Sequence, residues 1–399
     1  MLPLMLPLNW QRVRLGDVAE IKRGASPRPI ENPKWFCANS NVGWVRISDI
    51  SKNSRFLYKT AQKLSKKGIE KSRFVKQNSL IMSMCATIGK PIITKIDTCI
   101  HDGFVVFENP KIDLNYLYYF LCYIEKEWLE SGQQGSQVNL NVDLIKNKEV
   151  FCPKDLNEQI AIANILSDVD RYLYALDALI LKKESVKKAL SFELLSQRKR
   201  LKGFNQNWQK VRLGDICEFG NGGAYETLIV ENGDFKLISL NSIDIDGNLK
   251  NTMKRVNFYD NSLKQDDIVM VLSDVAHGDF LGLCAVIPSN DYVLNQRMGR
   301  LRKKNDCINI LFLRLYINAN QKYFKMQGQG SSQLNLSKKA IEDFEIPLPP
   351  LNEQIAIANI LSALDSEIIS LKNKKRQFEN IKKALNHDLM SAKIRVLEK

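Results

Sequence analysis

The twelve residues LNEQIAIANILS occupy positions 156–167, and the same twelve letters return at positions 351–362. In a helix, the isoleucine, alanine and leucine side chains of this segment would lie nearly all the way round the axis. A helix that is apolar on every side is buried on every side. The segment therefore predicts the start of two equivalent helices, each covered by its adjoining globular domain or by another protein.

The repeat extends through the whole chain. Three further echoes keep the same order: WQRVRLGDVAEIKRG at 10–24 with WQKVRLGDICEFGNG at 208–222, GSQVNL at 135–140 with SSQLNL at 331–336, and KKAL at 187–190 with KKAL at 382–385. Their offset stays near 195 residues, which is too long for a solenoid repeat. The sequence therefore predicts two domains of one kind in tandem.

Each unit divides into a globular part and a long helix. Short apolar runs bounded by turn residues, such as LIMSMCATIGK at 80–90 and DDIVMVLS at 266–273, indicate mixed α/β domains. The predicted fold class is therefore α/β in the broad α+β sense, with an internal pseudo-twofold repeat. The predicted boundaries are 1–153 and 204–349 for the two globular domains, and 154–203 and 350–399 for the two helical segments.

The long helices are predicted at about 157–200 and 352–397, with Asn157 and Asn352 placed to cap their first turns. A 40-residue helix would form a rod of about 60 Å.

Apolar residues recur along both helices at spacings of four and three, which is the seam of a coiled coil. The seam comprises Ile162, Leu166, Val169, Leu173, Leu176 and Ile180, then Ile357, Leu361, Leu364, Ile368 and Leu371, with Lys183, Lys187, Lys375 and Lys382 interrupting it. Neither helix can bury its stripe alone, so we expect the two to pack against each other. Tandem units related by a pseudo-twofold axis make the pair antiparallel. The alternative is that each helix folds back onto its own domain.

The charge balance points to a polyanionic partner. The chain carries 58 lysines and arginines against 44 acidic residues, a formal net charge of +14. Nucleic acid is the first partner that such an excess indicates, and an anionic membrane surface is the second. A solvated, lysine-rich surface is the alternative.

Cysteine and histidine usage gives no sign of a disulfide framework or a metal site. The eight cysteines are scattered without a CxxC pair, and the three histidines share no metal-ligand spacing. Reduced thiols are typical of a cytoplasmic protein. No run of about 18 apolar residues predicts a membrane span.

Motifs for catalysis are missing from the sequence. We find no GxxxxGK[ST], GxGxxG, HExxH or GxSxG pattern, and no Asn/Asp-Pro-Pro-aromatic motif of amino-methyltransferases. A non-catalytic DNA-binding chain fits this pattern best. A self-contained DNA-modifying enzyme and a coiled-coil scaffold with no DNA role are the alternatives.

Basic side chains supply candidate phosphate contacts. The stretch from Arg55 to Lys76 contains eight basic residues and one acid, and a solvated face is the alternative interpretation. The basic candidates are Arg55, Lys59, Lys63, Lys66 and Lys67 in the first unit, and Lys254 and Arg255 in the second.

Base reading needs polar side chains that differ between two domains with different target sequences. The divergent positions are Arg46 and Ser48 against Ile238 and Ser239, and Asp102 against Gln296. A repeated loop adds Gln137 and Asn139, then Gln333 and Asn335. Asn and Gln can contact adenine through two hydrogen bonds. Because this loop is alike in both units, we expect its residues to shape the loop or to contact the DNA backbone.

Four motifs together resemble the specificity (S) subunit of type I restriction–modification systems. They are WQ-VRLGD at the start of each unit, TIGK at 87–90, VLNQ at 293–296 and PLPPLNEQIAIANILS at 347–362. The resemblance covers essentially the whole chain. The last motif is quite specific, whereas TIGK alone is weak.

The resemblance implies a non-catalytic subunit with two target recognition domains, each reading one half of a bipartite site on double-stranded DNA. The antiparallel helices would act as a ruler for the spacer between the halves. Two modification subunits would bind S-adenosylmethionine and methylate adenine N6, and restriction subunits would join them. No cofactor is expected on this chain, because S-adenosylmethionine, Mg and ATP would belong to the partner subunits.

The resemblance also adds site residues. Further DNA candidates are Thr87, Lys90, Gln296 and Arg297, and the candidates for binding the modification subunits are Asn157, Glu158, Gln159 and Ile162 with Asn352, Glu353, Gln354 and Ile357. Two departures stand out. FCPKDLNEQ at 151–159 replaces PLPPLNEQ, and IHDG at 100–103 stands where the second unit has LNQR.

Overall fold

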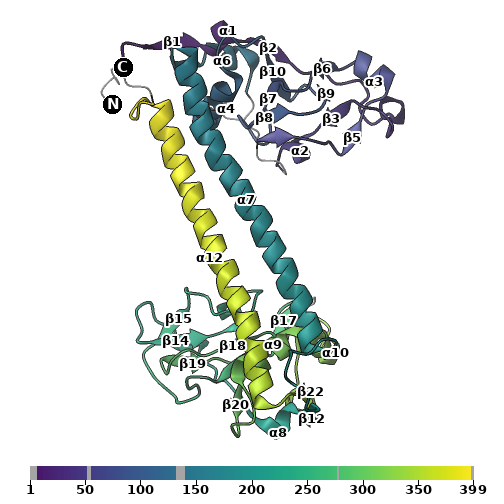
Figure 1. Cartoon of the computed structure of the whole chain (residues 1–399), viewed down its shortest axis with the longest axis vertical. Coiled ribbons are helices and arrows are strands. Elements are labelled where there is room, and N and C mark those ends of the chain that lie inside the picture. The colour runs from purple at the N-terminus through teal and green to yellow at the C-terminus, as the bar shows by residue number, and fades with distance from the viewer. Residues whose placement is uncertain (1–6, 52–54, 132–139, 276–277, 397–399) are drawn as a thin grey trace. The chain divides into compact units, whose positions relative to one another are not determined.

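A computed structural model describes residues 7–51, 55–131, 140–275 and 278–396 (Figure 1). The chain divides into two compact units, one comprising Met1–Asp177 with Asn373–Lys399 and the other Ala178–Lys372. Each unit therefore contains one globular domain, part of the long helix that follows that domain, and part of the other long helix.

The first globular domain is built on three sheets. Strand β1 (Trp10–Arg14) pairs antiparallel with β11 (Glu149–Pro153), which closes the domain at its two chain ends. A five-stranded sheet has the order β2 (Glu20–Arg23), β10 (Phe104–Glu108), β7 (Leu80–Ser83), β8 (Pro91–Thr94) and β4 (Phe56–Leu57). A four-stranded sheet has the order β5 (Gln62–Lys63), β3 (Gly43–Val45), β9 (Thr98–Ile100) and β6 (Arg73–Val75).

Short helices connect these strands. They are α1 (Leu15–Val18), η1 (Pro33–Trp35), α2 (Ile47–Ser51), α3 (Lys66–Glu70), α4 (Leu114–Tyr123), α5 (Glu125–Ser131) and α6 (Val142–Asn147). The side chains of Tyr116, Tyr119 and Phe120 in α4 are fully buried. They form one core with Ile162 and Leu166 of the first long helix and with Leu389 and Met390 from the end of the second. The C-terminal part of the chain thus completes the core of the N-terminal domain.

The second domain repeats this plan. Strand β12 (Gln209–Arg212) pairs antiparallel with β22 (Glu345–Leu348) as β1 does with β11. Its larger sheet has the order β13 (Cys217–Asn221), β20 (Met298–Lys303), β16 (Ile268–Val271) and β18 (Cys284–Val286). The smaller sheets are β15 (Lys254–Val256), β14 (Phe235–Ile238) and β19 (Tyr292–Leu294), and the pair β17 (Ser273–Val275) and β21 (Gln333–Asn335). Its helices are α8 (Leu213–Ile216), η2 (Glu226–Leu228), η3 (Leu240–Ser242), α9 (Ile310–Ala319), α10 (Gln321–Gln327) and α11 (Lys338–Glu342).

The two long helices are α7 (Leu156–Leu195) and α12 (Leu351–Met390). Both begin one residue before the predicted starts and end before the predicted ends. The predicted caps are wrong for this reason. In α7 the cap is Asp155, whose Oδ1 accepts the backbone N–H of Asn157 at 2.9 Å, and α12 follows directly on Pro350.

Within each unit the two helices run antiparallel, as predicted. In the first unit Asp170 pairs with Lys382 at 2.5 Å and Asp177 with Lys375 at 2.6 Å. The residue number therefore rises along α7 as it falls along α12. The second unit repeats the pattern with Lys183–Glu367 at 2.8 Å and with Lys187–Asp365. The lysines that interrupt the apolar seam therefore reach across to carboxylates of the opposite helix.

Helix α12 contains a stretch that is long and apolar enough, by length and composition, to cross a membrane. In the second unit, however, Ile357 and Leu361 of this stretch are buried in the domain core. Glu353, at its start, is fully buried and ion-paired with Arg200 at 2.6 Å. These contacts are those of a helix that packs against its own domain.

Candidate nucleic-acid interface

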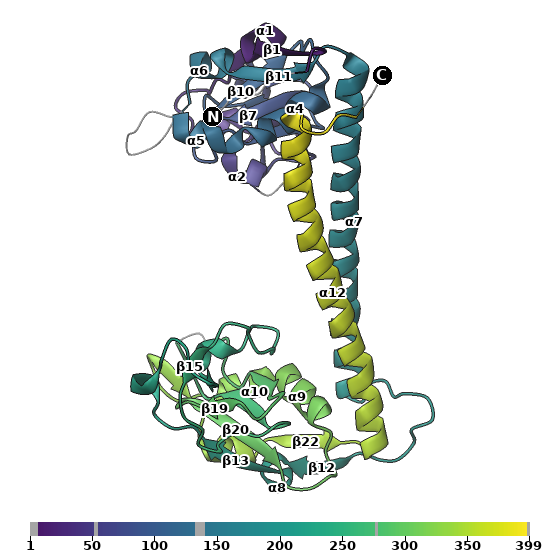
Figure 2. The same cartoon turned by 90° about the vertical axis from the view of Figure 1, so that its left-hand side faces the viewer.

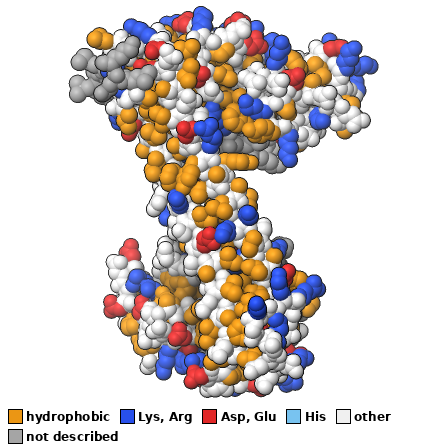
Figure 3. All heavy atoms as spheres, viewed as in Figure 1, with side chains coloured by type: hydrophobic (Ala, Val, Ile, Leu, Met, Phe, Trp, Pro, Cys, Tyr) orange, Lys and Arg blue, Asp and Glu red, His pale blue; other side chains and the backbone are white. Residues whose placement is uncertain are grey.

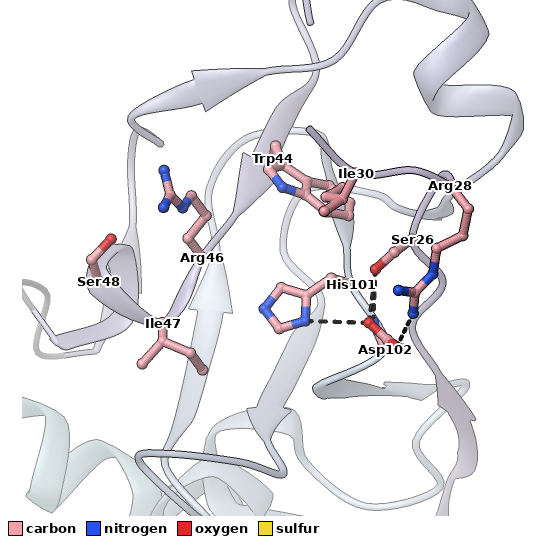
Figure 4. Close-up of a pocket in the computed structure, with 9 residues that line it drawn as sticks. All are labelled: Ser26, Arg28, Ile30, Trp44, Arg46, Ile47, Ser48, His101 and Asp102. Carbon is pink, nitrogen blue, oxygen red and sulfur yellow. Dashed lines mark hydrogen bonds and ion pairs between the residues drawn. The ribbon is translucent and has the colours of Figure 1, made fainter. Parts of the chain in front are cut away.

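A hollow of about 430 Å³ lies at the carboxyl ends of β3 and β9 in the first domain (Figure 4). The two strands are parallel neighbours with Val45 opposite Ile100, so Arg46 and His101 leave the sheet side by side. The lining residues are Ser26, Arg28, Ile30, Trp44, Arg46, Ile47, Ser48, His101 and Asp102. The predicted base-reading candidates Arg46, Ser48 and Asp102 are thus brought together. Ser26, Arg28 and Trp44 were not predicted.

Hydrogen bonds and burial set the protonation states of Asp102 and His101 in this hollow. Asp102 accepts from the Ser26 hydroxyl at 2.7 Å and from the Arg28 guanidinium at 3.0 Å. The Ser26 hydrogen bond, then a backbone hydrogen bond and the charge of Arg28, hold the pKa of Asp102 below its usual range despite partial burial. Burial lowers the pKa of His101, whose Nδ1 accepts the backbone N–H of Gly103 at 2.9 Å. The imidazole is therefore neutral at neutral pH and carries its proton on Nε2.

Arg46 offers an accessible guanidinium at the rim. Its backbone N–H donates to Asp49 Oδ2 at 2.9 Å, and Asp49 Oδ1 accepts the backbone N–H of Ala61 at 3.0 Å. The carboxylate therefore fixes the backbone from which the side chain projects. The guanidinium contacts Gln62 Oε1 at 3.3 Å in an exposed position, which leaves donors facing solvent. A planar fork of this kind suits the two acceptors of a guanine edge or a phosphate.

The second domain has the same frame with other side chains. Strands β14 and β19 are parallel, with Ile238 opposite Leu294. Ser239 follows β14 and donates its N–H to Ser242 Oγ at 2.9 Å, as Arg46 does to Asp49. The counterpart of Arg46 is therefore Ser239. The predicted pairing of Arg46 with Ile238 is wrong by one residue.

By the same correspondence, the counterpart of Ser48 in the second domain is Asn241, whereas the predicted counterpart was Ser239. Asn295 takes the position of His101. It is buried, accepts the N–H of Tyr225 at 3.1 Å and donates to Glu226 Oε1 at 2.8 Å. Gln296 stands for Asp102 as predicted and is half-buried, and Arg297 beside it is exposed.

One glycine is kept in both copies because the backbone approaches closely. A Cβ on Gly24 would lie 1.9 Å from the carbonyl oxygen of His101, and a Cβ on Gly222 would lie 2.1 Å from that of Asn295. No side chain fits at either position. This glycine, shared by both copies, could have indicated from sequence that the segment carrying Ser26 and Arg28 lies against the strand ends.

A lysine surface covers the neighbouring strands and helix of the first domain. We use this name for Lys59, Lys63, Lys66, Lys67, Lys71 and Lys76, which are all exposed. None of the six forms an ion pair with a carboxylate in the described part of the chain. Lysine and arginine side chains gather over α3 at the upper right of Figure 3. Unpaired lysines on one face supply the charge that phosphate contact requires.

Arg55 is not part of this surface, although it was predicted with it. Only 8% of the residue is exposed. Its guanidinium donates to Tyr119 Oη at 2.8 Å, to Ser167 Oγ at 2.7 Å and to Asn115 Oδ1 at 2.7 Å. The predicted phosphate contact of Arg55 is therefore wrong, because these internal acceptors take its donors.

The other basic and polar candidates lie in the TIGK turn and in strand β15. Gly89 of the TIGK turn has φ +76° and packs against Trp128, which leaves Thr87 and Lys90 half-buried. Lys254 lies 3.4 Å from Glu226, and Arg255 donates to the carbonyl of Gly233 at 2.9 Å.

The second copy of the glutamine–asparagine loop is described, and it is held by its own hydrogen bonds. The Asn335 side chain accepts from Ser273 Oγ and donates to the carbonyl of Gln333 at 3.2 Å, while its backbone pairs with Gln329. This agrees with a loop-shaping role for Asn335. Gln137 and Asn139 lie outside the described residues.

The glutamate and glutamine of each dodecamer bind residues of the preceding domain. We call these side chains the latch: Glu158 and Gln159 in the first copy, and Glu353 and Gln354 in the second. The buried carboxylate of Glu158 accepts from Asn9 Nδ2 at 2.9 Å and from Trp10 Nε1 at 3.2 Å. In the second copy Glu353 accepts from Trp208 Nε1 at 3.0 Å and from both arms of Arg200 at 3.1 and 2.6 Å. The WQ-VRLGD and LNEQ motifs are therefore repeated together because the tryptophan of one binds the glutamate of the other.

The glutamine of each latch ties the helix start to its domain. Gln159 accepts the N–H of Asp113 at 2.8 Å and donates to the carbonyl of Pro153 at 2.8 Å. Gln354 makes the matching bonds to Asn309 and Pro349, also at 2.8 Å.

These bonds correct most of the predicted partner-binding set. Glu158, Gln159, Ile162, Glu353, Gln354 and Ile357 are all buried against their own domains. Asn157 and Asn352 are exposed, and so are the apolar side chains of Leu156, Ile160, Leu351 and Ile355. Among the described residues, no cluster of three His, Cys, Asp or Glu side chains could hold a metal ion.

Both halves of the chain match one protein-family model, described as the type I restriction modification DNA specificity domain, over residues 7–184 and 205–380. The chain is 27% identical to the type I restriction enzyme MjaVIII specificity subunit of Methanocaldococcus jannaschii, over 98% of this chain and 95% of that protein. It is 25% identical to the EcoprrI specificity subunit of Escherichia coli over 42% of this chain and 44% of that protein. Among solved structures, the S subunit of a type I restriction–modification system from M. genitalium matches 98% of this chain and 97% of its own, with a TM-score of 0.64 and 18% identity.

Proposed function

The chain belongs to the type I restriction modification DNA specificity domain family, and from this premise we propose that it is the non-catalytic specificity subunit of such a complex. Each globular domain reads one half of a bipartite site on double-stranded DNA. The antiparallel helices set the spacer between the two halves. The lysine surface contacts phosphates, and the positions at the carboxyl ends of the parallel strands read bases.

One observation carries this proposal: the same strand frame presents different side chains in the two domains. Arg46, Ser48, His101 and Asp102 in the first domain stand where the second has Ser239, Asn241, Asn295 and Gln296. Phosphate contacts carry no sequence information, so two readers of different sequences must differ at their base contacts. A retained frame with exchanged polar side chains at one edge meets that requirement.

The partner subunits follow from the family. Two modification subunits, which hold S-adenosylmethionine and methylate adenine N6, dock on the two copies of the dodecamer face that carries Asn157 and Ile160, or Asn352 and Ile355. Restriction subunits, with Mg and ATP, join that complex. This chain holds no cofactor of its own, and the complex works in the cytoplasm without membrane contact.

The non-catalytic role is tested by methyl transfer in vitro. The chain alone, mixed with S-adenosylmethionine and DNA, should transfer no methyl group, and transfer should begin when the modification subunit is added. Methyl transfer by the chain alone would overturn the proposal.

Base reading is tested by Arg46→Ala in the complex with modification subunits. Loss of a two-donor base contact costs about 1–3 kcal/mol of discrimination. Sequence preference should therefore relax at one position of one half-site and stay unchanged in the other half-site. If binding weakens equally for all sequences, Arg46 contacts phosphate and the hollow is not a base reader.

A further inference from the structure

The junction between the first domain and its helices contains a continuous polar network. Arg55, directly before β4, donates to Tyr119 of α4 and to Ser167 of α7. The Tyr119 hydroxyl donates to Asp170 Oδ2 at 2.6 Å, and Asp170 Oδ1 pairs with Lys382 of α12 at 2.5 Å. Figure 2 shows α4 beside both long helices. One chain of hydrogen bonds therefore links a strand of the recognition domain to α7 and α12.

The guanidinium of Arg55 is held from several sides. Its third acceptor is Asn115 Oδ1 at 2.7 Å. Its Cζ lies 4.8 Å from the ring centroids of both Phe56 and Tyr119, and 5.4 Å from that of Tyr118. A buried charge needs hydrogen-bond partners and a nearby opposite charge. The two terminal nitrogens of Arg55 have acceptors, whereas its buried Nε–H has none. Here the opposite charge is Asp170, which accepts from the same Tyr119 hydroxyl that accepts from Arg55.

The second unit builds its junction differently. Lys187 pairs with Asp365 as Lys382 does with Asp170. The repeat position of Tyr119 in α9 is Leu315, which has no hydroxyl, and that of Tyr118 is Arg314. Ser362, the repeat of Ser167, has a buried hydroxyl oxygen without a hydrogen-bond partner. The second unit therefore lacks the tyrosine hydroxyl that links Arg55 to Asp170 in the first. The Arg55–Tyr119–Asp170 connection is therefore not repeated in the second unit.

We propose that Arg55 is a positioning residue that fixes the angle of the first recognition domain on the α7–α12 pair, and thereby the spacer length that the subunit accepts. The inference rests on the proposed function. Apolar contacts between domain and helices are non-directional, whereas a guanidinium with three fixed acceptors defines an orientation. Without it, the apolar contacts around Ile162 and Leu166 remain and the domain can tilt.

The tilt that matters is small. A 150-residue domain has a radius of gyration of roughly 15 Å. Bases along one strand are about 3.4 Å apart. A tilt of roughly 13° therefore moves the reading face of a domain of that radius by one base pair. Loss of the Arg55 network should therefore show itself as a wider range of accepted spacers.

The experiment uses the complex with modification subunits and a series of duplexes. The duplexes carry the same two half-sites, with the spacer shortened or lengthened by one or two base pairs. Adenine methylation is measured for the wild type, Arg55→Met and Tyr119→Phe. Met keeps most of the volume of the arginine, and Phe removes only the hydroxyl that links Arg55 to Asp170.

The wild type should strongly prefer one spacer. In Arg55→Met that preference should fall at least fivefold while both half-site sequences stay the same, and Tyr119→Phe should change it in the same direction by less. A stable Tyr119→Phe complex keeps the test valid if Arg55→Met folds poorly. Arg12→Met, at an exposed arginine 3.6 Å from Glu149, should leave the preference unchanged.

Two outcomes separate this inference from the proposed function. If both variants lose activity or stability but keep the wild-type spacer preference, Arg55 is merely structural and the inference is overturned. If the wild-type complex shows no dependence on a bipartite site, the proposed function fails, and the inference fails with it.

Discussion

Replacing Gln354 with alanine should loosen the second domain from the start of α12. The side chain is fully buried, and it bonds to the Asn309 N–H and the Pro349 carbonyl at 2.8 Å and to the Cys307 carbonyl at 2.9 Å. A backbone group left unsatisfied in a buried site costs about 1–3 kcal/mol. The Pro349 bond is buried and the other two are partly buried, so we expect a total near 3 kcal/mol.

The first copy should be less sensitive. Gln159 makes two such bonds, to Asp113 and Pro153, so Gln159→Ala should cost about 2 kcal/mol. Asn157→Ala and Asn352→Ala change exposed positions of the same two helix turns. They should stay within about 0.5 kcal/mol of the wild type.

Hydrogen–deuterium exchange of the full chain measures this locally. Amides in the first turns of α9 and α12 should exchange roughly a hundredfold faster in Gln354→Ala, since each 1.4 kcal/mol is about a factor of ten. The matching turns of α4 and α7 should stay at the wild-type rate. If Gln354→Ala exchanges no faster there than Asn352→Ala, the latch does not hold the helix to the domain.

Three further predictions follow from the described contacts. Burial lowers the pKa of His101 below its ordinary value of 6.5. Below that pH the unfolded chain binds more protons than the folded chain, so the first domain should lose stability on acidification. His101→Asn should reduce this loss when thermal unfolding is compared at about pH 7 and about pH 5. Glu353→Gln should destabilise the second domain in domain-resolved exchange, because it replaces the charged acceptor of two Arg200 hydrogen bonds with a neutral one. Changing Lys66 and Lys67 together to alanine should lower the salt slope of DNA binding by about 2.

Each of these changes has a control within the chain. Asparagine is the residue that the second domain carries at the position of His101. Glu158→Gln should cost only about 1 kcal/mol, because the donors to Glu158 are neutral. Lys182 and Lys188, which are exposed on α7, should leave the salt slope unchanged when both become alanine. An unchanged slope for Lys66 and Lys67 as well would remove this pair from the DNA contacts.

The repeat and the antiparallel helices could be predicted from sequence because they depend on periodicity. The role of Glu158 and Gln159 could not. A motif repeated within a chain looks the same whether its polar residues face a partner or bind the domain that precedes them. Only the matching repeat of Trp10 as Trp208 hinted at an internal pairing.

The register of the hollow was missed because the repeat offset varies along the chain. It is 198 residues at Trp10, 193 at Arg46 and 195 at the dodecamer. The predicted pairs imply offsets of 192 for Arg46 and 191 for Ser48, whereas the strands give 193 for both. Arg55 was misassigned for a different reason, since a run of basic residues does not show which one turns inward.

The division of the chain into units has a consequence for biosynthesis. The second unit, Ala178–Lys372, is one continuous segment. The core of the first domain includes Leu389 and Met390, so it stays incomplete until residue 390 has been made. The first domain is therefore translated first but completes its core last. Loss of the last turn of α12 should destabilise the first domain and leave the second domain stable.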